Sequence, residues 1–377
     1  MNSPVDWDRR GMLSGRSSGN LDLLRSLAVL CVMLDHLVPT MVRHGLPVAA
    51  PLVAWTAHLG QAGVLAFFVH TSLVLMFSLD KLAHESRGRE GHARLTARFY
   101  VRRLMRIYPL AWMAIALVLL CHLPAMTWRE TPPVTLSVVI ANLLLVQNLV
   151  TGQSVLGPLW SLPYEVEMYV VLPALYLLAR RPTGPRVLVA MIVLSSAIGL
   201  WLASVTGGRL NMVAYLPVFL CGVACHAWRR HGRAVLSARL WPVLIGALIL
   251  GYAALHLQRD RPDPALGWLF GALLSLAILH SREVPPSRWH VPVAQVVARY
   301  SYGLYLLHVP VLHLVFQLWQ PASLPLAVLA YFGLTAAASF LAYHLIEAPM
   351  VTLGQRLSPL RSPVAGSGAM RSSAQPG

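Results

Sequence analysis

The feature that most constrains the fold is a series of apolar segments, each close to the roughly 20 residues that a helix needs to cross a bilayer. Hydrophobic residues make up 56% of the 377-residue chain and charged residues only 12%, a balance typical of polytopic membrane proteins. We therefore predict an all-α, polytopic membrane protein with about ten transmembrane helices, near residues 21–40, 57–78, 99–122, 160–179, 187–205, 212–228, 240–257, 265–281, 300–318 and 325–346.

One further apolar run, at 134–150, sets the topology. If it crossed the membrane, every later arginine-rich loop would change sides. If it does not cross, 25 of the 30 Lys and Arg residues fall on one side, as the positive-inside rule requires of the cytoplasm. Asn142, Gln147 and Asn148 also suit a segment that faces protein or water better than one that faces lipid. We predict that this run is re-entrant or interfacial and that both termini are cytoplasmic.

The chain divides into one large domain and two tails. We predict a cytoplasmic N-terminal tail over 1–20, a transmembrane domain over 21–350, and a disordered cytoplasmic C-terminal tail over 351–377, which is rich in Ser, Gly, Pro and Ala. The net charge of +16 comes from arginines in alternate loops, which indicates membrane orientation and no nucleic-acid partner. The four cysteines lie in apolar segments and predict neither disulfides nor a metal site.

The first apolar segment, Leu21–Pro39, carries ionisable residues that are expensive inside a membrane. Arg25 and His36 are eleven residues apart, so both leave one face of a helix, roughly 16 Å apart along its axis. This spacing suggests two ends of a site that a substrate bridges. Asp35 points about 100° away from His36 on the same helix.

Arginines gather where the third predicted span begins. Arg103 and Arg106 lie deepest, and a pair of guanidinium groups suits a bidentate grip on phosphates. We therefore expect a phosphorylated cytosolic molecule there. Arg98 and Arg102 are better explained by topology and by side chains that reach toward the membrane surface.

Two later segments bring polar residues into apolar helices. In LWSLPYEVEMYVVLP, Glu165 is placed to orient or tune an imidazole, and its alternative role is that of an acid favoured at a helix start. In RYSYGLYLLHVP, hydroxyls and an imidazole share a helix face, and hydrogen bonding between helices is the alternative. The residues that we expect to line a site in addition are Asp35, His70, Trp160, Ser161, Ser301, Tyr302, Tyr305 and His308.

Four stretches together resemble the acyltransferase 3 family of integral membrane O-acyltransferases, which modify bacterial surface glycans and some secreted small molecules. They are LDLLRSLAVLCVMLDH, the Arg-x-x-Arg of Arg103 to Arg106, WSLPYEVEMY and SYGLYLLHVP, the last followed by IEAP at 346–349. The resemblance extends over about residues 20–350. Two places depart from the family's pattern: Val69 and then His70 follow the paired phenylalanines where the family commonly has Ser-Gly-Phe, and Asp35 stands at a usually apolar position.

The resemblance implies His36 as the catalytic histidine and Arg25 as its partner across the site. It also implies Arg103 and Arg106 as residues of the donor site, and Glu165 as an acid within the site. His36 would act as general base, and a covalent acyl-histidine is the other route.

The function that follows is transfer of an acyl group, expected to be acetyl, from cytosolic acyl-CoA to a hydroxyl of a cell-surface polysaccharide or lipopolysaccharide sugar. The enzyme would lie in the bacterial inner membrane and use acyl-CoA as co-substrate, without a bound cofactor or metal. Acylation of a macrolide-type secondary metabolite is one alternative. A proton-coupled transporter or flippase, with a relay of His36, Asp35 and Glu165, is another. The sequence leaves the oligomeric state open.

Overall fold

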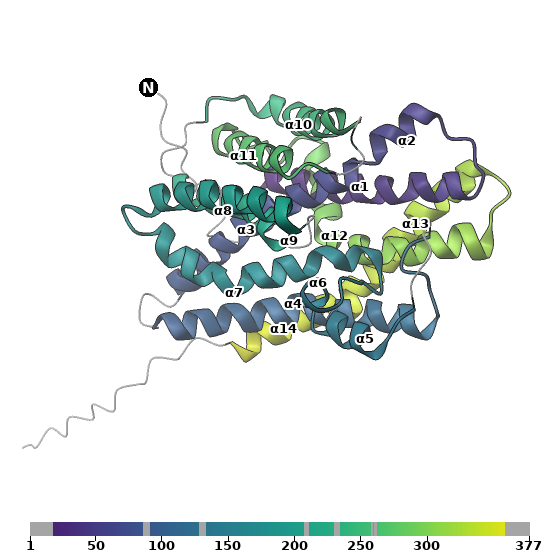
Figure 1. Cartoon of the computed structure of the whole chain (residues 1–377), viewed down its shortest axis with the longest axis horizontal. Coiled ribbons are helices and arrows are strands. Elements are labelled where there is room, and N and C mark those ends of the chain that lie inside the picture. Colours follow the sequence, from purple (N-terminus) through teal and green to yellow (C-terminus); the bar gives the residue numbers. More distant parts are fainter. Residues whose placement is uncertain are drawn as a thin grey trace, which may run out of the picture.

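The structure is a computed structural model that describes residues 18–85, 91–127, 133–206, 211–229, 234–257, 259 and 262–358. In these ranges the chain is helical and forms no strand beyond one isolated bridge, as shown in Figure 1. The α-helices are α1 (Gly19–Arg43), α2 (Ala50–Thr56), α3 (Leu59–Glu85), α4 (His92–Leu120), α5 (Leu136–Leu143), α6 (Gln147–Val150), α7 (Leu162–Ala179), α8 (Gly184–Thr206), α9 (Asn211–Trp228), α10 (Trp241–His256), α11 (Pro264–His280), α12 (His290–His313), α13 (Leu324–Ala342) and α14 (Ala348–Leu357). Short 3-10 and π-helical turns are η1 (Gly157–Ser161), η2 (Ala238–Leu240), η3 (Leu314–Trp319) and η4 (Tyr343–Glu347).

Helix α1 is the central element and packs along both α3 and α12. Its N-terminus is capped by the Ser18 hydroxyl, which accepts a hydrogen bond from the amide of Leu21. Helix α3 approaches closely because Gly63 has no side chain: a Cβ there would lie 2.5 Å from the carbonyl oxygen of Ala28. Small residues at such crossings let membrane helices pack backbone against backbone.

Seven segments of the described chain are long and apolar enough to cross a membrane, so the predicted count of about ten is not confirmed. Helices α9 and α11 fall short of the length of a full span, and α1, which carries four charged residues, is not among the seven. The seven segments are Ala50–Glu85, His92–Leu120, Gly157–Ala179, Gly184–Leu202, Ala238–His256, His290–Trp319 and Leu324–Leu357.

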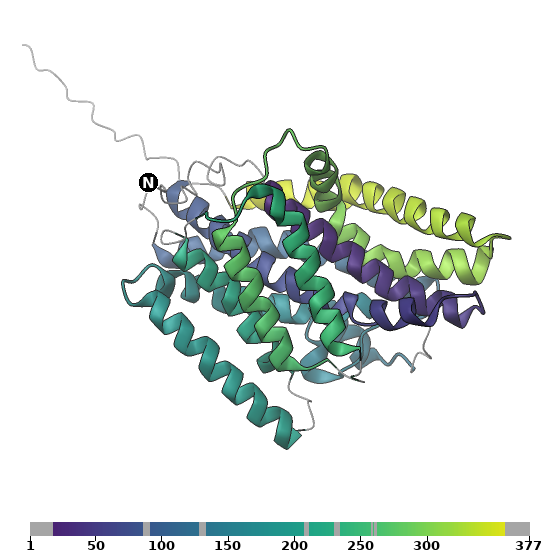
Figure 2. The ribbon, with the colours of Figure 1, turned by 90° about the horizontal axis from the view of Figure 1, so that it is seen from above.

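Helix α8 lies at the edge of the molecule, where Figure 2 shows it in teal, angled away from the other helices. Large apolar side chains cover its outer side and are more than half exposed, among them Val193, Leu194 and Trp201. In water this surface would be unfavourable, and in a bilayer it is the side that faces lipid.

The run 134–150 forms two short helices, α5 and α6, which are far shorter than the roughly 20 residues of a membrane-spanning helix. Polar side chains within it bind protein atoms. The Asn142 amide donates to the carbonyl of Gln153 (2.9 Å) and accepts from the amide of Val155 (3.1 Å). Asn148 donates to the carboxylate of Glu167 (2.8 Å). The segment is therefore folded against α7 and the loop before it.

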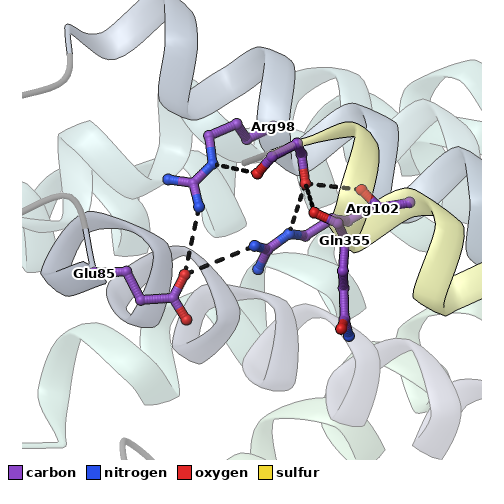
Figure 3. Close-up of polar contacts among 6 residues, drawn as sticks. Glu85, Arg98, Arg102 and Gln355 are labelled. Carbon is purple, nitrogen blue, oxygen red and sulfur yellow. Dashed lines mark hydrogen bonds and ion pairs between the residues drawn. The ribbon is translucent and has the colours of Figure 1, made fainter. Parts of the chain in front are cut away.

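The C-terminal helix α14 continues to Leu357, past residue 351 where the tail was predicted to begin. An arginine cluster holds its end against α4, as Figure 3 shows. Arg98 donates from Nε to the carbonyl oxygen of Ser358 (3.1 Å) and from Nη2 to Glu85 Oε2 (3.4 Å). Arg102 donates from Nε to Ser358 Oγ (3.0 Å) and lies 3.7 Å from Glu85 Oε2. The predicted tails at 1–17 and 359–377 lie outside the described residues.

Candidate active site

Helices α1 and α12 run in the same direction, side by side. The Ser26 hydroxyl donates to the carbonyl of Ala294 (2.8 Å), and further along both helices His36 Nδ1 lies 2.7 Å from His308 Nε2. Two contacts in the same order along both helices fix their relative register. The first predicted site segment is therefore aligned with the last.

A cavity of about 120 Å³ opens between α1, α3, α4, α7 and α12. It gathers residues from all four stretches that the sequence singled out, although these are far apart along the chain. The predicted site residues that line it are Arg25, His70, Arg103, Arg106, Ser161, Glu165, Ser301, Tyr302 and Tyr305. The predicted site residues that are not among its lining are Asp35, His36, Trp160 and His308.

Three arginines, Arg25, Arg103 and Arg106, make one wall of the cavity positively charged. The Nε atoms of Arg25 and Arg103 are buried and have no hydrogen-bond partner among the described residues. Arg106 differs, because its guanidinium pairs with the buried carboxylate of Glu347, which comes from η4. A buried donor without an acceptor is costly, so this wall is built to receive an anionic or oxygen-rich group.

Glu165 stands on the same side of the cavity as these arginines. It is hydrogen-bonded to Thr71 of α3 and lies 3.5 Å from the hydroxyl of Tyr169, one turn further along α7. Its charge interacts with those of Arg25 and Arg103. The expected role of Glu165 in orienting an imidazole is not matched by these contacts, since the neighbour at 2.7 Å from His36 is His308.

The cavity ends about one helical turn before the pair His36 and His308. The hydroxyls of Ser161 and Tyr305 are 2.7 Å apart and both line the cavity. Tyr305 precedes His308 by three residues on α12, and the two ring centroids are 6.3 Å apart. The two histidines are therefore the next polar layer beyond the cavity.

Asp35 also belongs to this layer. Its Oδ2 lies 3.6 Å from His36 Nε2. The side chain rests against Gly60 of α3, where a Cβ would overlap the carboxylate. Of the remaining candidates, His70 is buried at the cavity, whereas Trp160 packs against the rings of Tyr164 and Tyr215 outside it.

Sequence reasoning missed three polar residues of the site. Thr71 and Tyr169 line the cavity beside Glu165, and Glu347 pairs with Arg106. Tyr169 had a usable signal, because it lies one turn from Glu165 and so shares its face. Glu347 had another, because it is an acid at the end of a long apolar segment.

The fold and the site together define a multi-pass membrane protein with an arginine-walled cavity and a buried histidine pair beside it. A family model described as an acyltransferase domain matches residues 18–344, and the chain belongs to this acyltransferase 3 family. It is therefore a membrane acyltransferase. No curated protein and no solved structure matches the chain.

Proposed function

We propose that the protein transfers an acetyl group from cytosolic acetyl-CoA to a hydroxyl of a cell-surface polysaccharide or lipopolysaccharide sugar, across the bacterial inner membrane. The observation that carries the donor half of the proposal is the pair of buried, unpartnered Nε donors of Arg25 and Arg103. The phosphates of CoA are the oxygen-rich anions that guanidinium groups bind best.

The donor would lie along α1. With its phosphates at the arginine wall, the pantetheine arm follows the cavity toward Ser161 and Tyr305. Beyond the hydroxyls of these two residues, the arm places its thioester at His36, roughly 16 Å from Arg25 along the helix. The acceptor approaches from the other side of the membrane. In this orientation both termini of the enzyme are cytoplasmic.

His36 acts as the general base. As the acceptor oxygen bonds to the thioester carbonyl carbon, its proton moves to an imidazole nitrogen of His36. The C–S bond then breaks, and the imidazolium returns the proton to the departing sulfur. The products are the ester and CoA-SH, and the histidine is neutral again.

The test is transfer of label from radioactive acetyl-CoA to a purified glycan by the purified, lipid-reconstituted enzyme. His36→Ala should lower kcat by roughly 10²–10⁴-fold, the usual contribution of a general base. His344→Ala is the matched control, because this imidazole is exposed in η4 and lies against the ring of Tyr300, away from the cavity lining. Full transfer by His36→Ala would show that this residue is not the base.

The acceptor class is tested separately with the unaltered enzyme. A surface polysaccharide, a lipopolysaccharide and a macrolide are offered in parallel with the same labelled donor. Label in the glycans supports the proposal. Label in the macrolide alone would support acetyl-CoA as the donor and would show that the acceptor is not a glycan.

A further inference from the structure

His36 and His308 meet through their ring nitrogens. The Nδ1 atom of His36 is 2.7 Å from the Nε2 atom of His308, and the ring planes differ by 18°. The ring centroids are 4.9 Å apart, much further than the two nitrogens. The rings therefore meet edge to edge in a hydrogen bond, and do not stack face to face. His308 is fully buried and His36 is 7% exposed.

A third atom determines the direction of this hydrogen bond. His308 Nδ1 lies 3.1 Å from the carbonyl oxygen of Leu304, one turn earlier on α12. A carbonyl oxygen only accepts, so Nδ1 of His308 carries a hydrogen. In the neutral ring, Nε2 of His308 is then an acceptor, and the hydrogen between the two rings belongs to Nδ1 of His36.

The remaining nitrogen of His36 thereby becomes the basic one. With Nδ1 protonated and donating to His308, the lone pair of the neutral His36 ring is on Nε2. This nitrogen lies 3.6 Å from Asp35 Oδ2. A carboxylate at that distance favours the positive charge that the ring acquires when Nε2 takes a proton.

We infer that His308 is a positioning residue that holds His36 in the tautomer with the lone pair on Nε2, and so selects the nitrogen that receives the acceptor's proton. The inference rests on the proposed role of His36 as general base. His308 neither takes nor gives a proton during the reaction. When Nε2 is protonated, Nδ1 of His36 still donates to His308, so the chain from His36 through His308 to Leu304 is unchanged.

Two replacements of His308 separate positioning from packing. The side-chain carbonyl of Gln can accept the hydrogen bond from Nδ1 of His36, whereas Leu fills similar space without an acceptor. We expect His308→Leu to lower kcat roughly 10–100-fold, as the loss of such supporting hydrogen bonds does. The KM for acetyl-CoA should stay within about twofold, because the arginine wall is untouched. The kcat of His308→Gln should be at least about tenfold higher than that of His308→Leu.

Three results would overturn the inference: full kcat in His308→Leu, an equal loss in His308→Leu and His308→Gln, or a loss that appears in KM alone. Binding of CoA, measured by calorimetry, verifies that each variant is folded. If His308→Leu does not bind CoA, the same comparison is made with His308→Met, whose flexible side chain adapts to irregular cores.

His36→Ala distinguishes failure of this inference from failure of the proposed function. If His36→Ala transfers label as well as the unaltered enzyme, the general-base proposal fails, and the inference with it. If His36→Ala is inactive while His308→Leu is fully active, His36 remains the base and only the positioning role of His308 is refuted.

Discussion

Two arginine pairs around α4 have the same charge and different surroundings. The anchor pair, Arg98 and Arg102, is met by Glu85 and by the carbonyl and hydroxyl of Ser358. The cavity pair, Arg25 and Arg103, presents buried Nε donors for which the described residues supply no acceptor. Guanidinium groups that are already satisfied hold helices together, whereas the cavity pair has hydrogen bonds left to give to a ligand.

The largest expected effect is on donor binding by the cavity pair. Arg25→Ala and Arg103→Ala should each raise the Kd for CoA roughly 10–100-fold, because a hydrogen bond to a charged group is worth about 1.5–3 kcal/mol. Calorimetry with CoA measures this, with Arg98→Ala as the matched control that keeps its affinity. Equal Kd values in all three variants would abolish the distinction between the two pairs.

The next effect is on stability, and it belongs to the anchor pair. Arg98→Ala should lower the free energy of unfolding by about 1–3 kcal/mol, because Glu85 and the Ser358 carbonyl both lose a partner. Thermal unfolding in detergent measures the loss. Arg94→Ala, on an exposed position of the same helix, serves as control and should leave the Tm unchanged. A normal Tm for Arg98→Ala, or a weakened affinity for CoA, would contradict the anchor role.

Arg106 stands between the two classes, since it lines the cavity and is also paired with Glu347. Glu347→Gln removes a negative charge near the expected phosphates and releases Arg106 from its partner. We expect CoA to bind about threefold to tenfold more tightly, because a charge at roughly 10 Å and an effective dielectric constant of 20 contributes about 1.7 kcal/mol before screening. Weaker binding in calorimetry would place Arg106 with the anchor pair.

The smallest effect is expected for Arg102, whose side chain is 21% exposed and lies at the rim of the anchor cluster. Arg102→Ala should cost about 1 kcal/mol of stability through its lost bond to the Ser358 hydroxyl. Donor affinity should not change, although the neighbouring residue Arg103 is proposed to bind the donor. A Kd for CoA that rises as much as in Arg103→Ala would show that Arg102 also reaches the donor.

Helix periodicity and residue chemistry were enough to predict the all-helical fold, and they singled out half of the residues that line the cavity. Arg25, Arg103, Glu165 and Tyr305 come from four different segments, and they line one cavity. Each is a polar residue in an apolar helix, and burial of such groups requires that they face one another. The matched range of the family model, residues 18–344, contains all four segments.

The partners of individual side chains could not be predicted in this way. The sequence placed Arg103 deeper than Arg98, but it did not show that Glu85 and Ser358 are the partners that make Arg98 an anchor. Asp35 had no explanation until α3 brought Gly60 against it. The predicted bridge from Arg25 to His36 assumed one continuous space, whereas the hydroxyls of Ser161 and Tyr305 lie between the cavity and the histidine.

The predicted number of spans is not confirmed, because seven segments of the described chain meet the length and composition of a span. A run measures how much of a helix is apolar, but helices buried among other helices need not be long or uniformly apolar. Helix α1, which is central and charged, and helix α11, which is short, were both counted as ordinary spans. Both helices pack against neighbouring helices, α1 against α3 and α12 and α11 against α9, and this packing does not depend on a long, uniformly apolar sequence.

The anchor pair and its partners, Glu85 and Ser358, have a consequence for engineering the chain. Glu85 is the last residue of α3 and Ser358 directly follows α14, so the arginines of α4 fasten two helix ends to one another. A reporter or affinity tag fused after Ser358 starts from a fastened residue and leaves every bond of the cluster in place. A shortened chain that stops at Gln355 instead deletes both acceptors that Ser358 supplies, and exposes a loosened helix end to proteases.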